Sequence, residues 1–164
     1  MVEFVIGTDI FRQEGDLYLI TVNCVGVMGK GLAKSFKEAH PDLYERYRHD
    51  CRMKIITIGN PVIYQAENGK RYMMFPTKER WQDPSLPEYI SAGLQWMVDS
   101  VTSADNEEGD IEPTWRIVIP PLGCANGGLS FNDVKESIKL FGSHMPNPIV
   151  VVYPPWMEQD DKWD

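Results

Sequence analysis

Short apolar runs alternate along this chain with longer stretches whose apolar residues recur every three or four positions. The run LYLITVN (residues 17–23) is continuously apolar and rich in β-branched residues, which is typical of a strand buried on both faces. Residues 87–101 instead place Ile90, Leu94 and Met97 at helical spacing, which predicts a helix that buries one side. This alternation predicts an α/β fold with helices on both faces of a central sheet.

The same patterns give the expected order of elements. We expect strands over residues 2–7, 17–23, 55–58, 62–65, 71–75, 115–119 and 149–153. We expect helices over residues 32–39, 42–52, 87–101 and 132–141. Asn68-Gly69 is a strong signal for a hairpin turn. The polar, acidic residues 102–113 predict a surface loop, and residues 155–164 predict a loose acidic tail.

Size, cysteine content and charge limit the classes of protein. A chain of 164 residues is expected to form a single domain over residues 1–164. Its three cysteines contain no CxxC pair, which argues against a disulfide framework and a cysteine zinc site. The sequence shows no secretory signal and no membrane span, so we expect a cytoplasmic protein. We also expect a monomer. The net charge of −8 excludes a broad basic face for duplex DNA but allows one anion held by backbone N–H groups.

Two glycine-rich loops follow predicted strands and precede predicted helices, over residues 22–36 and 120–131. The first is no Walker loop, because Lys30 is followed by Gly31, and no dinucleotide fingerprint, because Lys34 stands where the third glycine belongs. Taken alone, such a loop is either a tight strand-to-helix turn without a ligand or an anion cradle. Two loops at the carboxyl ends of strands in one small sheet favour a cradle for a diphosphate-bridged nucleotide.

The motifs VNCVGVMGKGLA and PPLGCANGGL, with FPTKERW (residues 75–81) between them, resemble the macrodomain family of ADP-ribose binders. The resemblance covers residues 3–153. It implies a three-layer macrodomain fold with a mixed central sheet. FPTKERW resembles the branch that contains the antitoxin-like, DarG-type DNA ADP-ribosyl glycohydrolases and the terminal ADP-ribose protein glycohydrolases.

The resemblance also implies a set of ligand-binding residues. The adenine would be met by Asp9 and Ile10, and stacked on by Tyr153. The distal ribose would be faced by Asn23. The first loop would contact the diphosphate and distal ribose through Gly26, Val27, Met28, Gly29 and Gly31. The second loop would contact the diphosphate through Leu122, Gly123, Cys124, Ala125, Asn126, Gly127, Gly128 and Leu129. No metal and no cofactor is implied.

Lys78 matches the lysine that this branch uses as its catalytic group. The anomeric carbon of the distal ribose is an electrophile, where a lysine can form a Schiff-base-like adduct or assist departure of the nucleobase as a charged group. The implied reaction is hydrolysis of an ADP-ribosyl group from a nucleobase in single-stranded DNA. Two alternatives stay open: a phosphatase acting on ADP-ribose 1″-phosphate, and a reader that binds ADP-ribose without chemistry.

Three further residue types have competing interpretations. Gly127 stands where the terminal ADP-ribose members carry an aspartate, which weakens a protein-carboxylate substrate. Cys24 and Cys124 lie in the two glycine loops, where we favour small apolar fillers over nucleophiles. Trp81 follows Lys78 closely enough to shape the distal-ribose pocket or stack on a base, and packing alone is an equal alternative.

Overall fold

The computed structural model describes residues 1–162, in which one sheet takes the order β1-β6-β5-β2-β4-β3. Its strands are β1 (Val2–Ile6), β2 (Leu17–Val22), β3 (Val62–Gln65), β4 (Arg71–Pro76), β5 (Ile117–Ile119) and β6 (Ile149–Tyr153). All neighbouring pairs are parallel except β3 with β4, which form the hairpin predicted from Asn68-Gly69. The mixed sheet is therefore confirmed.

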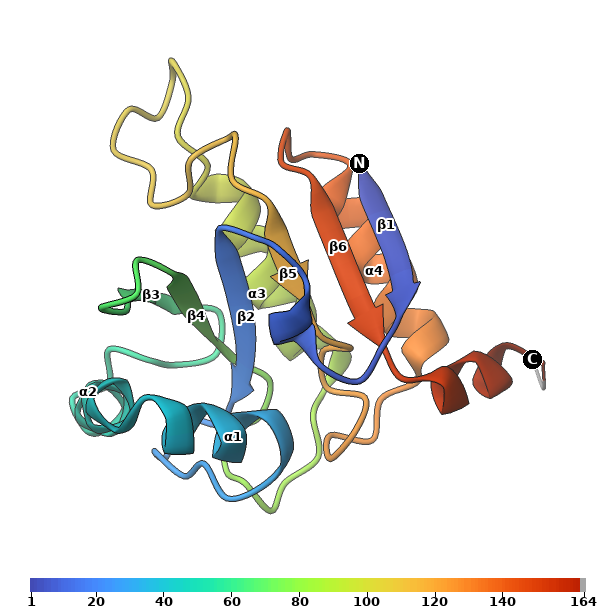
Figure 1. Ribbon diagram of the computed structural model, residues 1–164, viewed down its shortest axis with the longest axis horizontal. Helices are drawn as coiled ribbons and strands as arrows, with labels where there is room; N and C mark the ends of the chain where they lie inside the picture. The colour runs from blue at the N-terminus through green and yellow to red at the C-terminus, as the bar shows by residue number, and fades with distance from the viewer. Residues whose placement is uncertain (163–164) are drawn as a thin grey trace.

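Helices cover both faces of the sheet, as predicted (Figure 1). The helices are α1 (Gly31–Ala39), α2 (Pro41–Arg52), α3 (Pro87–Asp99) and α4 (Phe131–Gly142), with short 3-10 helices η1 (Ile10–Arg12) and η2 (Pro155–Lys162). One apolar core joins the sheet to α3 and α4, and a second joins it to α1 and α2. These two cores make the three layers of the fold.

Strand β2 shows how the sequence fills both cores. Leu17 and Leu19 belong to the core under α3 and α4, whereas Tyr18 and Ile20 belong to the core under α1 and α2. All four side chains are at most 1% exposed. Because successive side chains of a strand point to opposite faces, a strand in the middle of a covered sheet must be apolar at every position.

The strand predicted over residues 55–58 is wrong. The backbone N–H groups of Ile55 and Ile56 both donate to the Asp50 carbonyl, which folds this segment back against the end of α2. Ile56 is fully buried there, so it anchors a turn. Of the predicted loose tail, residues 155–162 form η2, in which Met157 is only 6% exposed, and residues 163–164 lie outside the described residues.

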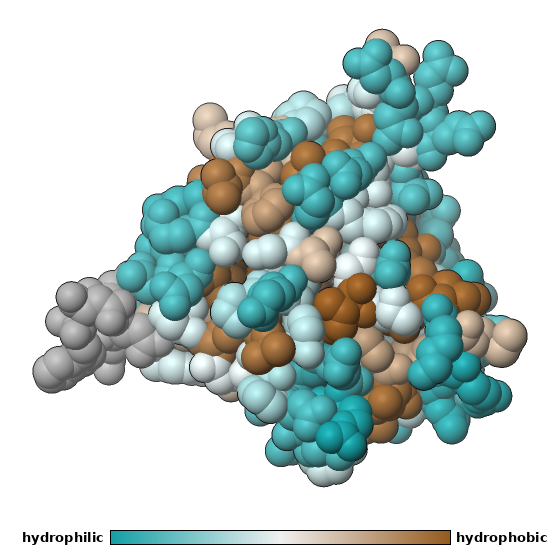
Figure 2. All heavy atoms as spheres, turned by 180° about the vertical axis from the view of Figure 1, so that it is seen from behind, coloured by the Kyte–Doolittle hydropathy of each residue, from teal (hydrophilic) through white to brown (hydrophobic). Residues whose placement is uncertain are grey.

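The parallel strands end at one edge of the sheet, where both glycine-rich loops and α1 lie (Figure 1). The acidic loop of residues 102–113 lies at the opposite edge, at the top of Figure 1. Figure 2 shows this loop from behind as a hydrophilic projection. The fold thus separates the candidate ligand loops from the most acidic surface segment.

Candidate functional site

A cavity of about 670 Å³ opens at the carboxyl ends of β2, β4 and β5, between the two glycine-rich loops. This volume lies in the usual range for a small-molecule site. Of the predicted ligand residues, the structure brings together around it Asn23, Val27, Gly29, Gly31, Lys78, Gly123, Ala125, Asn126 and Gly127. The two loops predicted to face each other do so across this cavity.

Asn23 shapes the first loop from within. Its Oδ1 accepts from the backbone N–H groups of Val25 and Val27, at 3.1 and 3.2 Å, and its Nδ2 donates to the Val27 carbonyl at 2.8 Å. The buried Tyr47 hydroxyl lies 2.8 Å from both the carbonyl oxygen and Oδ1 of Asn23. Asn23 is 7% exposed, so its amide holds the loop in place at the cavity wall.

The start of α1 supplies backbone donors to the cavity. Lys30 is the residue before the helix, and no side chain caps the first turn. Gly31, Leu32 and Ala33, the first three helical residues, all line the cavity. The N–H groups of a first turn have no partner within the helix, and the helix dipole places partial positive charge there. This wall is therefore suited to an anion.

The second loop is held in a conformation that needs two glycines. Gly123 has φ +73°, and a Cβ there would come within 2.8 Å of Leu129 Cδ1. A Cβ on Gly127 would lie 2.3 Å from both the Gly123 carbonyl oxygen and Ser85 Oγ. The aspartate found in the terminal ADP-ribose branch therefore has no room at position 127 in this loop.

Lys78 connects the lysine segment (residues 75–85) to the second loop. Its Nζ donates to the Asn126 carbonyl at 2.9 Å and to the Trp81 carbonyl at 3.1 Å. The half-buried side chain lines the cavity together with the exposed Lys30. Among the described residues, no aspartate or glutamate lines this cavity. Two cations without a lining carboxylate make a locally positive site in an acidic protein.

Backbone contacts join all three segments of the site. The Cys24 N–H donates to the Glu79 carbonyl at 2.9 Å, which ties the first loop to the lysine segment. The Ser85 N–H donates to the Gly127 carbonyl at 3.0 Å, which ties the lysine segment to the second loop. The position of Lys78 is thus determined by both loops.

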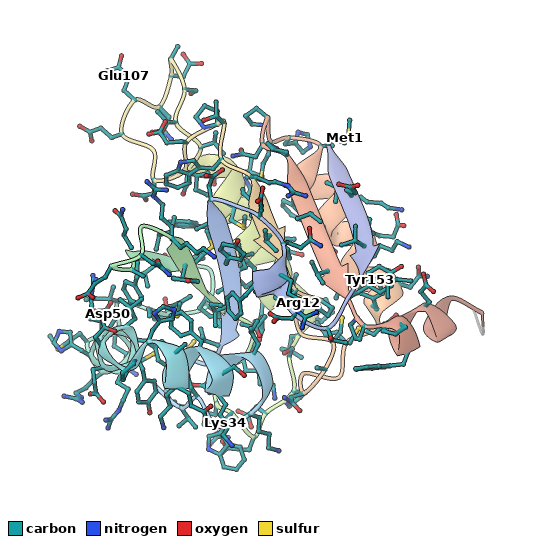
Figure 3. All side chains as sticks on the ribbon, in the orientation of Figure 1. Met1, Arg12, Lys34, Asp50, Glu107 and Tyr153 are labelled. Carbon is teal, nitrogen blue, oxygen red and sulfur yellow. The ribbon has the colours of Figure 1, made fainter. Side chains whose placement is uncertain are left out.

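Other predicted residues lie outside the cavity lining, in the parts of the structure described. Asp9 caps η1 by accepting from the Phe11 N–H, and Ile10 is buried in the core. Tyr153 is 6% exposed, packs on Phe131 with ring centres 4.8 Å apart, and donates to Glu158. Figure 3 shows Tyr153 well apart from Lys34 on α1. The remaining residues outside the lining are Gly26, Met28, Leu122, Cys124, Gly128 and Leu129.

Some lining residues are ones that motif reasoning missed. Thr21, Thr77 and Gln82 contribute polar side chains, and Pro120 and Pro121 form an apolar wall. Thr77 is only 5% exposed, and its place next to Lys78 in the FPTK motif was the signal available in the sequence. Pro120 and Pro121 open the PPLGCANGGL motif, and Thr21 lines the cavity because the sheet order places β2 between β5 and β4.

Burial disfavours ionisation of the Cys24 and Cys51 thiols. Burial raises the pKa of the Cys24 thiol to about 11, and that of Cys51 likewise to about 11. These thiols are neutral at physiological pH, which favours the interpretation of Cys24 as a packing residue over that of a nucleophile.

Within residues 1–162, no group of three or more His, Cys, Asp or Glu side chains is placed to hold a metal ion. None of the described helices is both long and apolar enough to cross a bilayer.

Comparison with known proteins shows to which family the chain belongs. The Macro domain family model matches residues 20–138. The DNA ADP-ribosyl glycohydrolase of Thermus aquaticus is 36% identical over 158 residues, which cover 94% of this chain and 41% of the relative. That of Mycobacterium tuberculosis is 34% identical over 150 residues, covering 90% of this chain and 40% of the relative. The chain therefore spans about two fifths of the length of these curated relatives.

Solved structures agree with the sequence matches. The macrodomain of Mycobacterium tuberculosis DarG aligns with a TM-score of 0.80 at 34% identity, over 94% of this chain and 98% of that one. Thermosipho africanus DarTG in complex with ADP-ribose aligns with a TM-score of 0.79 at 27% identity, over 94% of this chain and 42% of that one. Sequence motifs, sheet topology and comparisons agree, and the chain belongs to the macrodomain family.

Proposed function

We propose that the cavity binds ADP-ribose and that the protein hydrolyses ADP-ribosyl groups from a nucleobase in single-stranded DNA, with Lys78 as the catalytic residue. The observation that carries this proposal is the position of Lys78 Nζ, on the cavity wall and within hydrogen-bond distance of the second glycine loop at Asn126. An amine there lies beside the loop that, by resemblance, surrounds the diphosphate.

The relatives support the substrate class. Those from Thermus aquaticus and Mycobacterium tuberculosis are named DNA ADP-ribosyl glycohydrolases. A relative from Thermosipho africanus is named as a fusion of a DNA ADP-ribosyl transferase with such a glycohydrolase. The DarTG structure from that organism holds ADP-ribose. An antitoxin-like role, in which the protein reverses ADP-ribosylation of DNA, follows from the same likeness.

The electrostatics of the cavity suit a diphosphate. Each phosphate of ADP-ribose is anionic at neutral pH, and the cavity offers the first turn of α1 together with Lys30 and Lys78. Backbone N–H groups bind phosphate without side-chain charge, because partial positive charge gathers at the helix start. The absence of lining carboxylates, among the described residues, removes a source of repulsion.

Hydrolysis needs the bond between C1″ of the distal ribose and the base nitrogen to break. The hydroxyl of a water molecule ends on C1″ and its proton ends on the released base. Lys78 can act as a neutral amine that attacks the sugar and is later displaced by water, or as an ammonium that donates a proton to the leaving base. Because the cavity lining lacks a carboxylate among the described residues, Lys78 is the acid–base group available beside the second loop.

Three substrates distinguish this function from its alternatives. The protein is incubated with an ADP-ribosylated thymidine oligonucleotide, with ADP-ribose 1″-phosphate and with an ADP-ribosylated protein, and products are followed by mass spectrometry. We expect release of ADP-ribose from the oligonucleotide. Release of phosphate from the second substrate alone would identify a phosphatase. Tight binding of free ADP-ribose in calorimetry, with turnover of none of the three, would identify a reader.

A further inference from the structure

Charge is distributed unevenly over this acidic chain. Residues 30–54 hold seven of the 16 lysines and arginines but only four of the 24 aspartates and glutamates, so this segment carries +3 and the remainder −11. The segment forms α1 and α2, and the first turn of α1 lines the cavity. Figure 3 places Lys34 on α1 and Glu107 in the acidic loop at opposite ends of the molecule. The cations therefore gather on the side that holds the ligand site.

Three lysines of α1 form a row that begins at the cavity. Lys30 lines the cavity, and Lys34 and Lys37 follow at four and seven positions further along, which places all three on one face of the helix. Seven residues of helix span about 10 Å. Stacked nucleotides of one strand rise about 3.4 Å each, so the row has the length of about three nucleotides.

The row continues onto α2. Lys37 Nζ lies 4.5 Å from the centre of the Tyr44 ring, and the Arg48 guanidinium lies 5.8 Å from the same ring. Arg48 also pairs with Glu45 at 3.4 Å, and Glu38 is exposed on α1, so the surface is not uniformly cationic. Its sign is nevertheless positive, in contrast to the rest of the chain.

An exposed aromatic side chain stands at the same cavity. Trp81 is among the residues that line the cavity and is 55% exposed, so its indole is not used to fill the core. The Trp81 carbonyl accepts from Lys78 Nζ, which fixes this residue beside the proposed catalytic amine. Proteins that bind single strands combine a cationic track for the phosphates with aromatic side chains on which bases stack. Both features meet at this cavity.

We propose that the lysine row of α1 (Lys30, Lys34 and Lys37) holds the phosphates of the DNA strand that carries the ADP-ribosyl group, and that Trp81 stacks on a base next to the modified one. This inference rests on the proposed function, because it assigns a path to the strand of that substrate. The strand lies along the side formed by α1 and α2, away from the acidic loop.

The test compares two substrates of different length. Lys34→Gln/Lys37→Gln and a matched control, Lys135→Gln/Lys139→Gln on α4, are assayed on an ADP-ribosylated 12-nucleotide strand and on ADP-ribosylated thymidine. The value of kcat/KM is measured from 50 to 500 mM salt. Each phosphate contact with a single strand contributes about −0.7 to the slope of log affinity against log salt, so losing two contacts flattens the slope by about 1.4, or about 25-fold over this range. Both pairs remove two charges from a helix.

The expected result is a flatter salt dependence and a lower kcat/KM on the strand for the α1 variant alone, with wild-type activity on ADP-ribosylated thymidine. Trp81→Leu is expected to lower kcat/KM on the strand substrate roughly tenfold at all salt concentrations, since stacking depends little on salt. Equal salt slopes for the α1 variant and wild type would overturn the surface assignment while leaving the proposed function intact. Failure of wild type to hydrolyse either substrate would overturn the proposed function itself.

Discussion

Replacement of Gly29 by leucine separates ligand binding from folding. The backbone of Gly29 does not have positive φ, and a Cβ built there has only Val27 Cγ1 within 4 Å, at 3.9 Å. The larger side chain therefore costs the fold little, and the loss of glycine's freedom in the unfolded chain adds about 0.4–1 kcal/mol of stability. Gly29 lines the cavity, so a leucine side chain there occupies space that the diphosphate needs.

We expect Gly29→Leu to weaken ADP-ribose binding at least 100-fold, which corresponds to about 2.7 kcal/mol. The assay is titration calorimetry with ADP-ribose, together with urea unfolding of the same preparation. Gly123→Ala serves as contrast, because its positive φ and the 2.8 Å approach to Leu129 make it lose stability as well. Wild-type affinity in folded Gly29→Leu would refute the close approach of the first loop to the diphosphate.

Three further predictions concern the support of the site. Tyr47→Phe removes a buried hydroxyl that bonds Asn23, so we expect about 1 kcal/mol lower stability in urea and weaker ADP-ribose binding; unchanged binding would mean that Asn23 does not need this support. Burial raises the pKa of the Cys51 thiol from 9.0 to about 11, so the folded protein keeps this proton to higher pH than the unfolded chain does. The free energy of unfolding should therefore fall by up to about 2 kcal/mol as the pH rises from 9 to 11. Cys51→Ala should show a shallower fall of unfolding free energy over that range, and an identical fall would contradict the assignment. The scheme uses no metal, so glycohydrolase activity should persist in excess EDTA; its loss would count against the scheme.

Much of the fold follows from patterns in the sequence. Strand β2 is apolar at every position because both of its faces are covered, and α3 is recognisable from the spacing of Ile90, Leu94 and Met97. The run at residues 55–58 misleads because it is apolar without being a strand. Ile56 is buried by a turn whose backbone bonds go to Asp50, and nothing in the local composition distinguishes this from a short strand.

The site was predictable where motifs encode it. The two glycine loops and Lys78 meet at one cavity, since the order of strands and the rule for parallel sheets place them at the same edge. Asp9 and Tyr153 lie at the ends of β1 and β6, and their roles toward adenine stay predictions. The hydrogen bonds of Asn23 within its own loop could not be inferred, because they depend on how α2 packs against that loop.

Substitution of Lys78 tests the central claim most directly. Lys78→Met keeps an unbranched side chain but removes the amine, so we predict a loss of at least about 100-fold in the rate of ADP-ribose release from an ADP-ribosylated thymidine oligonucleotide. Binding of free ADP-ribose, measured by calorimetry on the same variant, should stay within a few-fold of wild type. A variant that binds ADP-ribose normally and releases it from the oligonucleotide at the wild-type rate would contradict catalysis by Lys78.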